Sequence, residues 1–326
     1  MCIIEPVKAF RLSSKFIGIL IITGVILATT SIYAESVKDR IVFTSERMSN
    51  GRGNDLFLVD GLQGKPVQLS AELRPWIHDP SFSPDGKEVV FISFPNIARM
   101  DIATRQVEFL TNNRGSNTMY SNLDWSYDGS SIAFLMSTDA DQQIRNICIM
   151  DIESRDIRQL TDSPGIKSRP SWSPDSSKIV YAEQDLQSHF HDLYVVDKEG
   201  KEVINITQTS DTDELFPFWL TDNRIAFMSF TQSSSAFDVF IMNMDGSERR
   251  KSGLSIESST TGSGIRGWVW SPDGTQILLS RQIWPDDSAP HMRQLKIYLI
   301  DVANGTKTLW MEDGSAPDWV KPVRVK

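Results

Sequence analysis

Short apolar runs alternate with polar turns along most of the chain. Runs such as Val89–Ile92 and Ile179–Tyr181 are rich in β-branched and aromatic residues and are bounded by Ser, Asp, Gly or Pro. This length and composition predict β-strands, and continuous apolarity indicates that both faces of each strand are buried. No stretch shows sustained 3.6-residue periodicity, so the pattern predicts an all-β protein without a helical core.

A unit of strand, tight turn and strand recurs five times, with Ser-Pro-Asp-Gly or a variant of it at the turn. Pro presets the backbone for a type I turn, and Asp and Gly favour the two positions that follow. The aromatic residues before these turns are spaced by 43, 47, 47 and 51 residues, which is typical of four-stranded propeller blades. These aromatic residues are Phe82, Trp125, Trp172, Trp219 and Trp270.

A third strand that ends in Asp or Asn follows in six places, and a fourth strand closes most units. The third strands are expected at 56–60, 97–101, 147–151, 193–197, 239–243 and 297–301. The fourth strands are expected at 67–70, 107–111, 157–161 and 203–207, with weaker equivalents at 248–252 and 307–310. The second strand also occurs six times, beginning with 41–45, so the chain contains six units.

The first strand of the unit occurs only five times in the interior of the chain. Its sixth copy is the segment 316–320, so the C-terminal segment is expected to supply the innermost strand that the N-terminal unit lacks. Pairing of the two ends closes the ring and removes open strand edges. We predict that residues 35–326 form one six-bladed β-propeller, with one blade built from both ends of the chain.

The first 34 residues have the pattern of a secretory signal. Three basic residues among the first 15 precede an apolar stretch at 16–28, and Ala34 offers a point of cleavage. As a helix this stretch reaches only about 20 Å, less than the roughly 30 Å hydrocarbon core of a membrane. Ile32 departs from the small-residue rule for cleavage. Residues 1–34 are therefore read either as a cleaved signal or as an uncleaved anchor at 16–30, and both readings predict that the rest of the chain is exported across the membrane.

Composition excludes several classes of function. The chain has 33 Lys and Arg against 42 Asp and Glu, and an acidic balance of this kind lacks the basic footprint of a nucleic-acid-binding protein. Its two cysteines, Cys2 and Cys148, cannot form a disulfide scaffold, and Cys148 is expected to be a small buried apolar residue. The chain has no G-x-S-x-G, G-x-x-x-x-G-K-[ST] or G-x-G-x-x-G motif, so the corresponding hydrolases and nucleotide-binding folds are not indicated.

The repeat itself, an aromatic residue, Ser-Pro-Asp-Gly, an apolar strand, then a strand such as Leu-Tyr-Val-Val-Asp, resembles the PD-type, or WD40-like, repeat of TolB-family propellers. The resemblance covers nearly all of residues 40–320. It implies a six-bladed propeller in the bacterial periplasm and, for the family's namesake, binding of envelope proteins of the Tol–Pal system. The namesake also has an N-terminal α/β domain, which this sequence is expected to lack. Partner contacts that depend on that domain are therefore not carried over.

Most of the repeated polar and aromatic residues have a structural interpretation. Asp85, Asp128, Asp175 and Asp273 occupy the same place in the repeated turn, and an active site does not need several copies of one residue. We interpret them as turn residues whose side chains bond the local backbone. The aligned Trp and Phe residues are interpreted as the core between the blades.

All four histidines lie outside the repeated positions. In a four-stranded blade, the loops between second and third strands and the connections between blades emerge on the same rim, and the histidines are expected there. Imidazoles near carboxylates can bind Zn²⁺ or another transition metal. The weak candidates for such a site are His78, His189, His191 and His291.

The same rim carries the long irregular segments and four aromatic residues, Trp76, Phe190, Phe237 and Trp284. Aromatic residues exposed on loops of a rigid scaffold favour partner binding. We therefore expect a non-enzymatic propeller without a cofactor that binds an envelope protein or glycan through this rim, with no nucleic acid. Membrane contact is expected only through an uncleaved N-terminal segment. The alternative is a metal-dependent lyase or hydrolase that acts on a sugar or lactone at the channel mouth.

Overall fold

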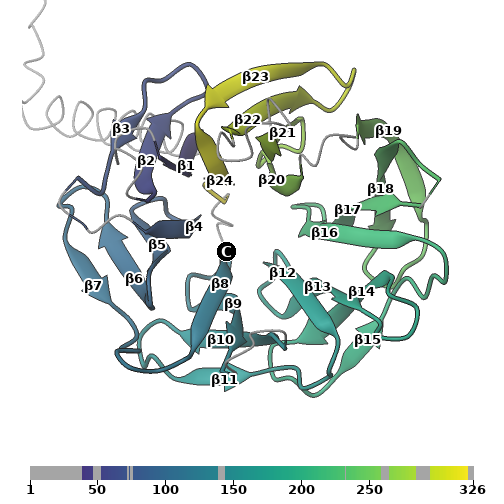
Figure 1. The fold of residues 1–326 in the computed structure, drawn as a ribbon, viewed down its shortest axis with the longest axis horizontal. Coiled ribbons are helices and arrows are strands. Elements are labelled where there is room, and N and C mark those ends of the chain that lie inside the picture. The colour runs from purple at the N-terminus through teal and green to yellow at the C-terminus, as the bar shows by residue number, and fades with distance from the viewer. Residues whose placement is uncertain are drawn as a thin grey trace, which may run out of the picture.

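The computed structural model describes residues 39–46, 53–71, 73, 76–138, 144–231, 233–257, 264–283 and 294–321. These residues form 24 strands in six four-stranded sheets, which are arranged as the blades of a ring (Figure 1). The predicted all-β, six-bladed propeller is therefore confirmed. The predicted signal or anchor at residues 1–34 lies outside the described residues. Among the described residues, no helix is long and apolar enough to span a membrane.

Each blade places one strand beside the central channel and three strands further out (Figure 1). The strands of each blade are given in order from the channel outwards. Blade 1 is β24 (Gly314–Trp319), β1 (Arg40–Ser45), β2 (Asp55–Asp60) and β3 (Val67–Gln68). Blade 2 is β4 (Ile77–Phe82), β5 (Glu88–Ser93), β6 (Asn96–Asp101) and β7 (Val107–Phe109). Blade 3 is β8 (Met119–Trp125), β9 (Ser131–Ser137), β10 (Asn146–Asp151) and β11 (Ile157–Gln159).

The other three blades repeat the same order. Blade 4 is β12 (Ile166–Trp172), β13 (Lys178–Gln184), β14 (His191–Asp197) and β15 (Val203–Asn205). Blade 5 is β16 (Asp213–Trp219), β17 (Arg224–Phe230), β18 (Ala236–Asn243) and β19 (Arg250–Glu257). Blade 6 is β20 (Ile265–Trp270), β21 (Gln276–Ile283), β22 (Gln294–Asp301) and β23 (Lys307–Glu312).

The ring is closed in blade 1, where strands from both ends of the chain pair. In the antiparallel register of β1 and β24, Ile41 lies opposite Trp319 and Val42 lies opposite Asp318. Figure 1 shows β24 on the channel side of β1. The predicted closure by the C-terminal strand is therefore confirmed, and it leaves neither end strand with an open edge at this seam.

The core lies between neighbouring blades. The aligned aromatic residues are all buried, as is Trp319 in the closing strand. Cys148 is also buried, in the cluster between blades 2 and 3, and burial raises the pKa of its thiol to about 12. The interpretation of these residues as core is confirmed.

The repeated turns are held by their Asp side chains. In blade 2, Oδ1 of Asp85 accepts hydrogen bonds from Ser83 Oγ (2.8 Å) and from the backbone N–H of Lys87 (3.1 Å). Burial alone would raise the pKa of Asp85, but these hydrogen bonds outweigh it and lower the pKa. The same Ser-to-Asp bond recurs at Asp128, Asp175 and Asp273, which confirms the turn interpretation.

The outermost strands of blades 5 and 6 differ from expectation. Their sequences are the weakest of the fourth strands, yet β19 and β23 are eight and six residues long, against two or three residues in the other blades. Tertiary packing explains the difference, because Leu254 and Ile256 of β19 enter the core between blades 5 and 6. Met311 of β23 likewise enters the core beside blade 1.

Candidate functional site

The propeller presents two faces with different kinds of connection. The turns from first to second strand and from third to fourth strand emerge on one face, which we call the turn face. The loops from second to third strand and the connections between blades emerge on the other, which we call the loop face. This division follows from the antiparallel order of every sheet. It assigns each candidate residue to one face of the ring.

A belt of hydrogen bonds links the inner strands of neighbouring blades. In four of the six described inner strands, the side chain just before the buried aromatic residue accepts the backbone N–H of the aromatic residue in the next blade. The pairs are Asp318 with Phe82 (2.9 Å), Ser81 with Trp125 (3.1 Å), Asp124 with Trp172 (2.7 Å) and Ser171 with Trp219 (3.1 Å). Each bond ties two blades together beside the channel.

The belt is interrupted on both sides of blade 6. The corresponding side chains are Phe218 in blade 5 and Val269 in blade 6, and neither has a hydrogen-bond acceptor. The backbone N–H groups of Trp270 and Trp319 therefore meet no side-chain acceptor from the preceding blade. Trp270 and Trp319 keep the strand register of the other aromatic residues. The belt is therefore interrupted only because Phe218 and Val269 stand where the other blades have Ser or Asp.

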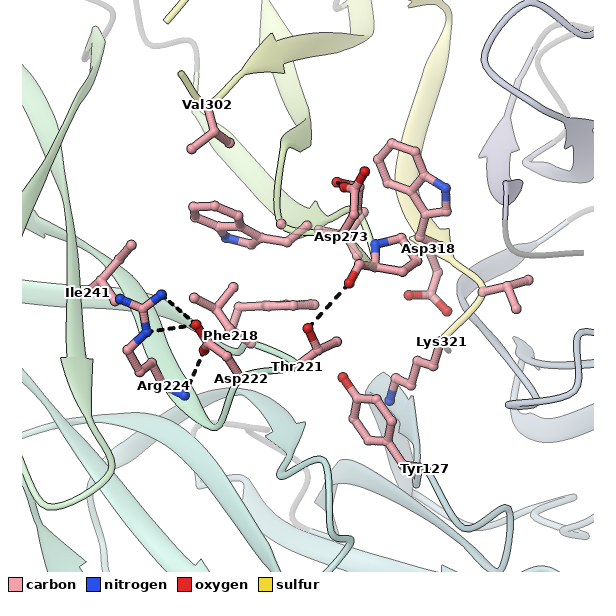
Figure 2. A pocket seen from close by; sticks show the side chains of 18 residues that line it. Tyr127, Phe218, Thr221, Asp222, Arg224, Ile241, Asp273, Val302, Asp318 and Lys321 are labelled. Carbon is pink, nitrogen blue, oxygen red and sulfur yellow. Dashed lines mark hydrogen bonds and ion pairs between the residues drawn. The ribbon is translucent and has the colours of Figure 1, made fainter. Parts of the chain in front are cut away.

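A cavity of about 300 Å³ opens on the turn face at this interruption (Figure 2). We call it the turn-face pocket. Its lining includes Phe218 and Val269, together with Trp270 and Trp319. Figure 2 shows turn residues from blades 5 and 6 facing the end of β24 across it. The polar lining residues are Tyr127, Thr221, Asp222, Arg224, Ser271, Asp273, Asp318 and Lys321.

Two indole N–H groups of this lining have no acceptor. Trp270 and Trp319 are 3% and 4% exposed, and the Nε1 atom of each is buried without a hydrogen-bond partner among the described residues. In blades 3, 4 and 5 the equivalent Nε1 atoms donate to Gly129 O, Asp124 O and Asn223 Oδ1, each at 3.1 Å. A buried donor without a partner costs about 1–3 kcal/mol, so the two indoles of this pocket stand out from the repeat.

The far wall of the pocket is a clasp between blades 1 and 3. Beyond the end of β24, the Nζ atom of Lys321 donates to Asp124 Oδ1 at 2.7 Å and to the backbone oxygen of Trp125. It also lies 4.9 Å from the ring centre of Tyr127. Figure 2 shows Asp318 beside Lys321. Burial raises the pKa of Asp318 to about 6, although the Lys321 ammonium acts in the opposite direction.

The described candidate histidines lie in two separate blades. His78 is in β4 of blade 2, with Nδ1 3.4 Å from Asp79 Oδ2. His191 begins β14 of blade 4, with Nδ1 2.8 Å from Asp213 Oδ1, and His189 precedes it. His291 lies outside the described residues. Within the described residues, no three His, Cys, Asp or Glu side chains form a group that could hold a metal ion. The metal site stays a prediction.

The candidate aromatic residues of the loop face differ in exposure. Trp76 is 67% exposed. Phe190 is half-buried, and Phe237 packs on Phe230 with ring centres 4.8 Å apart. Trp284 lies outside the described residues.

Sequence reasoning missed Phe94, which is 59% exposed and lies opposite Trp76 across the pair of β4 and β5. Its backbone N–H donates to Trp76 O at 3.4 Å. The signal for Phe94 was an aromatic residue in the very short loop before Pro95.

Comparison with known proteins identifies the repeat. Residues 34–185 match the family described as the TolB beta propeller domain. The resemblance to TolB-family propellers is confirmed. The Tol-Pal system protein TolB of Nitratidesulfovibrio vulgaris is 32% identical over 99 residues, which are 30% of this chain and 21% of that protein. The chain spans 17%, 21% and 30% of the length of three curated relatives that it matches.

Solved structures extend the likeness of fold beyond the matched residues. The propeller superposes on TolB from Acinetobacter baumannii with a TM-score of 0.67 and 19% identity, over 88% of this chain and 67% of that chain. It superposes on an oligogalacturonate lyase in complex with manganese with a TM-score of 0.59 and 13% identity, over 83% of this chain and 73% of that chain. At these identities the likeness is one of fold alone.

Proposed function

We propose that this TolB-type propeller is an exported, non-enzymatic protein that binds a protein partner in the bacterial envelope through its loop face. The observation that carries the proposal is the pair of Trp76 and Phe94, which are 67% and 59% exposed and directly opposite each other. Large aromatic residues at the centre of an interface supply much of its binding free energy. A protein partner is also the kind of ligand suggested by the Tol-Pal system protein among its relatives.

The backbone of Trp76 supports a binding role. Its φ angle is +138°, in a region that glycine adopts easily and a tryptophan rarely does. Such a conformation costs on the order of 1–3 kcal/mol. The ring is exposed and does not repay this cost by burial in the core. A side chain kept at an energetic cost on the surface is explained by a contact outside the molecule.

The export part of the proposal comes from the sequence. Residues 1–34 have the order of basic residues, apolar stretch and small residue that is typical of a signal. The propeller is then located in the envelope whether the segment is cleaved or kept as an anchor. Measuring the mass of the protein recovered from the cell envelope distinguishes these two cases.

Photo-crosslinking in the intact chain tests the partner. A photoreactive residue is placed at position 76, and a second preparation carries it at position 109 as a control. Phe109 is 51% exposed but lies on β7, the outermost strand of blade 2, whereas Trp76 and Phe94 flank the inner strands β4 and β5. We expect an envelope protein to be captured from position 76 and not from position 109.

The captured protein is then purified and titrated against three variants of the full chain. Trp76→Ala and Phe94→Ala should each raise Kd by roughly 30-fold, which corresponds to about 2 kcal/mol. Phe109→Ala should leave Kd unchanged. Trp76→Gly should raise Kd by the same factor as Trp76→Ala, while the free energy of unfolding stays level or rises, because glycine relaxes the backbone. Equal Kd values for all the variants would refute the proposal.

A further inference from the structure

We propose that the turn-face pocket is a binding site for a neutral sugar of about one hexose. This site is separate from the loop face, because it lies at the opposite ends of the inner strands and contains neither Trp76 nor Phe94. Its volume of about 300 Å³ falls at the lower end of the range for small-molecule sites. A negative result for sugar binding in this pocket therefore does not count against partner binding at the loop face, and the reverse also holds.

The first argument is the pair of unused donors. Trp270 Nε1 and Trp319 Nε1 are buried without acceptors among the described residues, and the belt that satisfies the other blades stops at Phe218 and Val269. Stability alone favours an acceptor for a buried indole N–H, and Gly129 O, Asp124 O and Asn223 Oδ1 are such acceptors in blades 3, 4 and 5. A ligand oxygen in the pocket would supply what the fold leaves out.

The second argument is the presence of acceptors on the same lining. The turn bonds of Asp273 from Ser271 and Thr275 all use Oδ1, so Oδ2 can accept from a ligand. Thr221 adds a hydroxyl oxygen to the same wall, and its O–H donates to Pro272 O at 3.3 Å. A ligand for this pocket must therefore both accept and donate hydrogen bonds, which is what a sugar hydroxyl does.

The third argument concerns charge. The two cations of the lining are engaged, because Lys321 is held by Asp124 and Arg224 binds Asp222 through Nε at 2.8 Å. The carboxylates of the lining would repel an anionic ligand at short range. The remaining surface consists of aromatic and aliphatic side chains, which suit the C–H face of a sugar ring. These features together favour a neutral polyol over a phosphate or a uronate.

Binding at the two indole N–H groups requires a shift of their rings. Both Nε1 atoms are buried in this structure, so a ligand oxygen reaches them only after the rings move. No intramolecular hydrogen bond of Nε1 opposes such a shift at Trp270 or Trp319. The same movement of Trp172 would break its bond to Asp124 O.

The test follows indole N–H signals in the full chain labelled with ¹⁵N at its nine tryptophans. The signals are assigned with single Trp→Phe variants at positions 270, 319 and 310. Trp310 is the control, because its Nε1 already donates to Leu62 O at 2.8 Å. The probes are glucose, galactose and N-acetylglucosamine, with glucuronate as the anionic comparison.

We expect at least one neutral sugar to shift the Trp270 and Trp319 signals in a saturable way, and Trp310 to stay unchanged. Trp270→Phe or Trp319→Phe should weaken sugar binding by about tenfold, and Trp310→Phe should leave it at the wild-type value. Far-ultraviolet circular dichroism identifies any variant that fails to fold. If a variant does not fold, the shift of that tryptophan's signal in the wild-type protein is the deciding measurement. Absence of a shift with every neutral sugar, or equal binding of glucuronate, would overturn the proposal.

Discussion

Replacing Asp318 by Asn should make the propeller more stable above pH 6. Asp318 is buried in the closing strand, and its Oδ2 accepts the backbone N–H of Phe82 at 2.9 Å. Burial raises the pKa of its carboxyl group from an ordinary 3.8 to about 6, with Lys321 offsetting part of this effect. Asn keeps an oxygen that can accept the Phe82 N–H and removes the buried charge.

The sign and size of the effect follow from linkage between proton binding and folding. Because the pKa of Asp318 is higher in the folded protein, the folded state holds the proton more tightly than the unfolded chain does. This contribution to stability is complete below pH 3.8, declines as the pH rises, and is lost above pH 6. The difference between the pKa values of 3.8 and about 6 corresponds to about 3 kcal/mol. This is the upper limit for the increase in the free energy of unfolding caused by Asp318→Asn at pH 8.

Urea denaturation of both proteins at pH 4.5, 6 and 8 measures this difference. The free energy of unfolding of the variant should exceed that of the wild type at pH 8, and the gap should narrow toward pH 4.5. Asp85→Asn is the matched control, because the pKa of Asp85 is lowered and its contribution is lost at acid pH. If Asp318→Asn lowers the free energy of unfolding at pH 8, or changes it by the same amount at all three pH values, then burial does not dominate the pKa of Asp318.

Three further changes probe the ring and its turns. Asp85→Ala should lower the free energy of unfolding by only about 1 kcal/mol in urea titrations, because it removes local turn bonds; complete unfolding would contradict the turn role. Lys321→Met should cost about 3 kcal/mol by the same measurement, since it leaves Asp124 without its partner; an unchanged midpoint would show that the clasp contributes nothing. Deletion of residues 315–326 removes the inner strand of blade 1, so calorimetry should record no cooperative transition and light scattering should record aggregation. A single sharp transition would refute closure as a requirement.

Much of the fold could be predicted because the chain repeats itself. Six copies of the second strand predicted the number of blades, and the displaced copy of the first strand at 316–320 predicted that this segment pairs with the one that begins at Ile41. Each repeat buries its aromatic residue for the same reason, so one local argument applied six times. The outer strands β19 and β23 escaped prediction because their burial depends on neighbouring blades rather than on their own sequences.

The candidate sites were less accessible from sequence. The loops drew attention to Trp76, but the exposure of Phe94 beside it depends on the register of β4 and β5. Phe218 and Val269 were visible as departures from the Ser and Asp found at equivalent positions. Their meaning was not visible, because the acceptor and the N–H that it serves belong to different blades, about one repeat apart in the chain.

The sequence by itself determined the strands, the turns and the circular order of the blades, since these depend on local patterns and on the count of repeats. Only the tertiary structure decided which donors remain without acceptors, where a cavity opens and which charges are buried. Those properties arise where side chains from separate blades meet. The burial of Asp318 and the unpaired indoles of Trp270 and Trp319 exist only once the ring is closed.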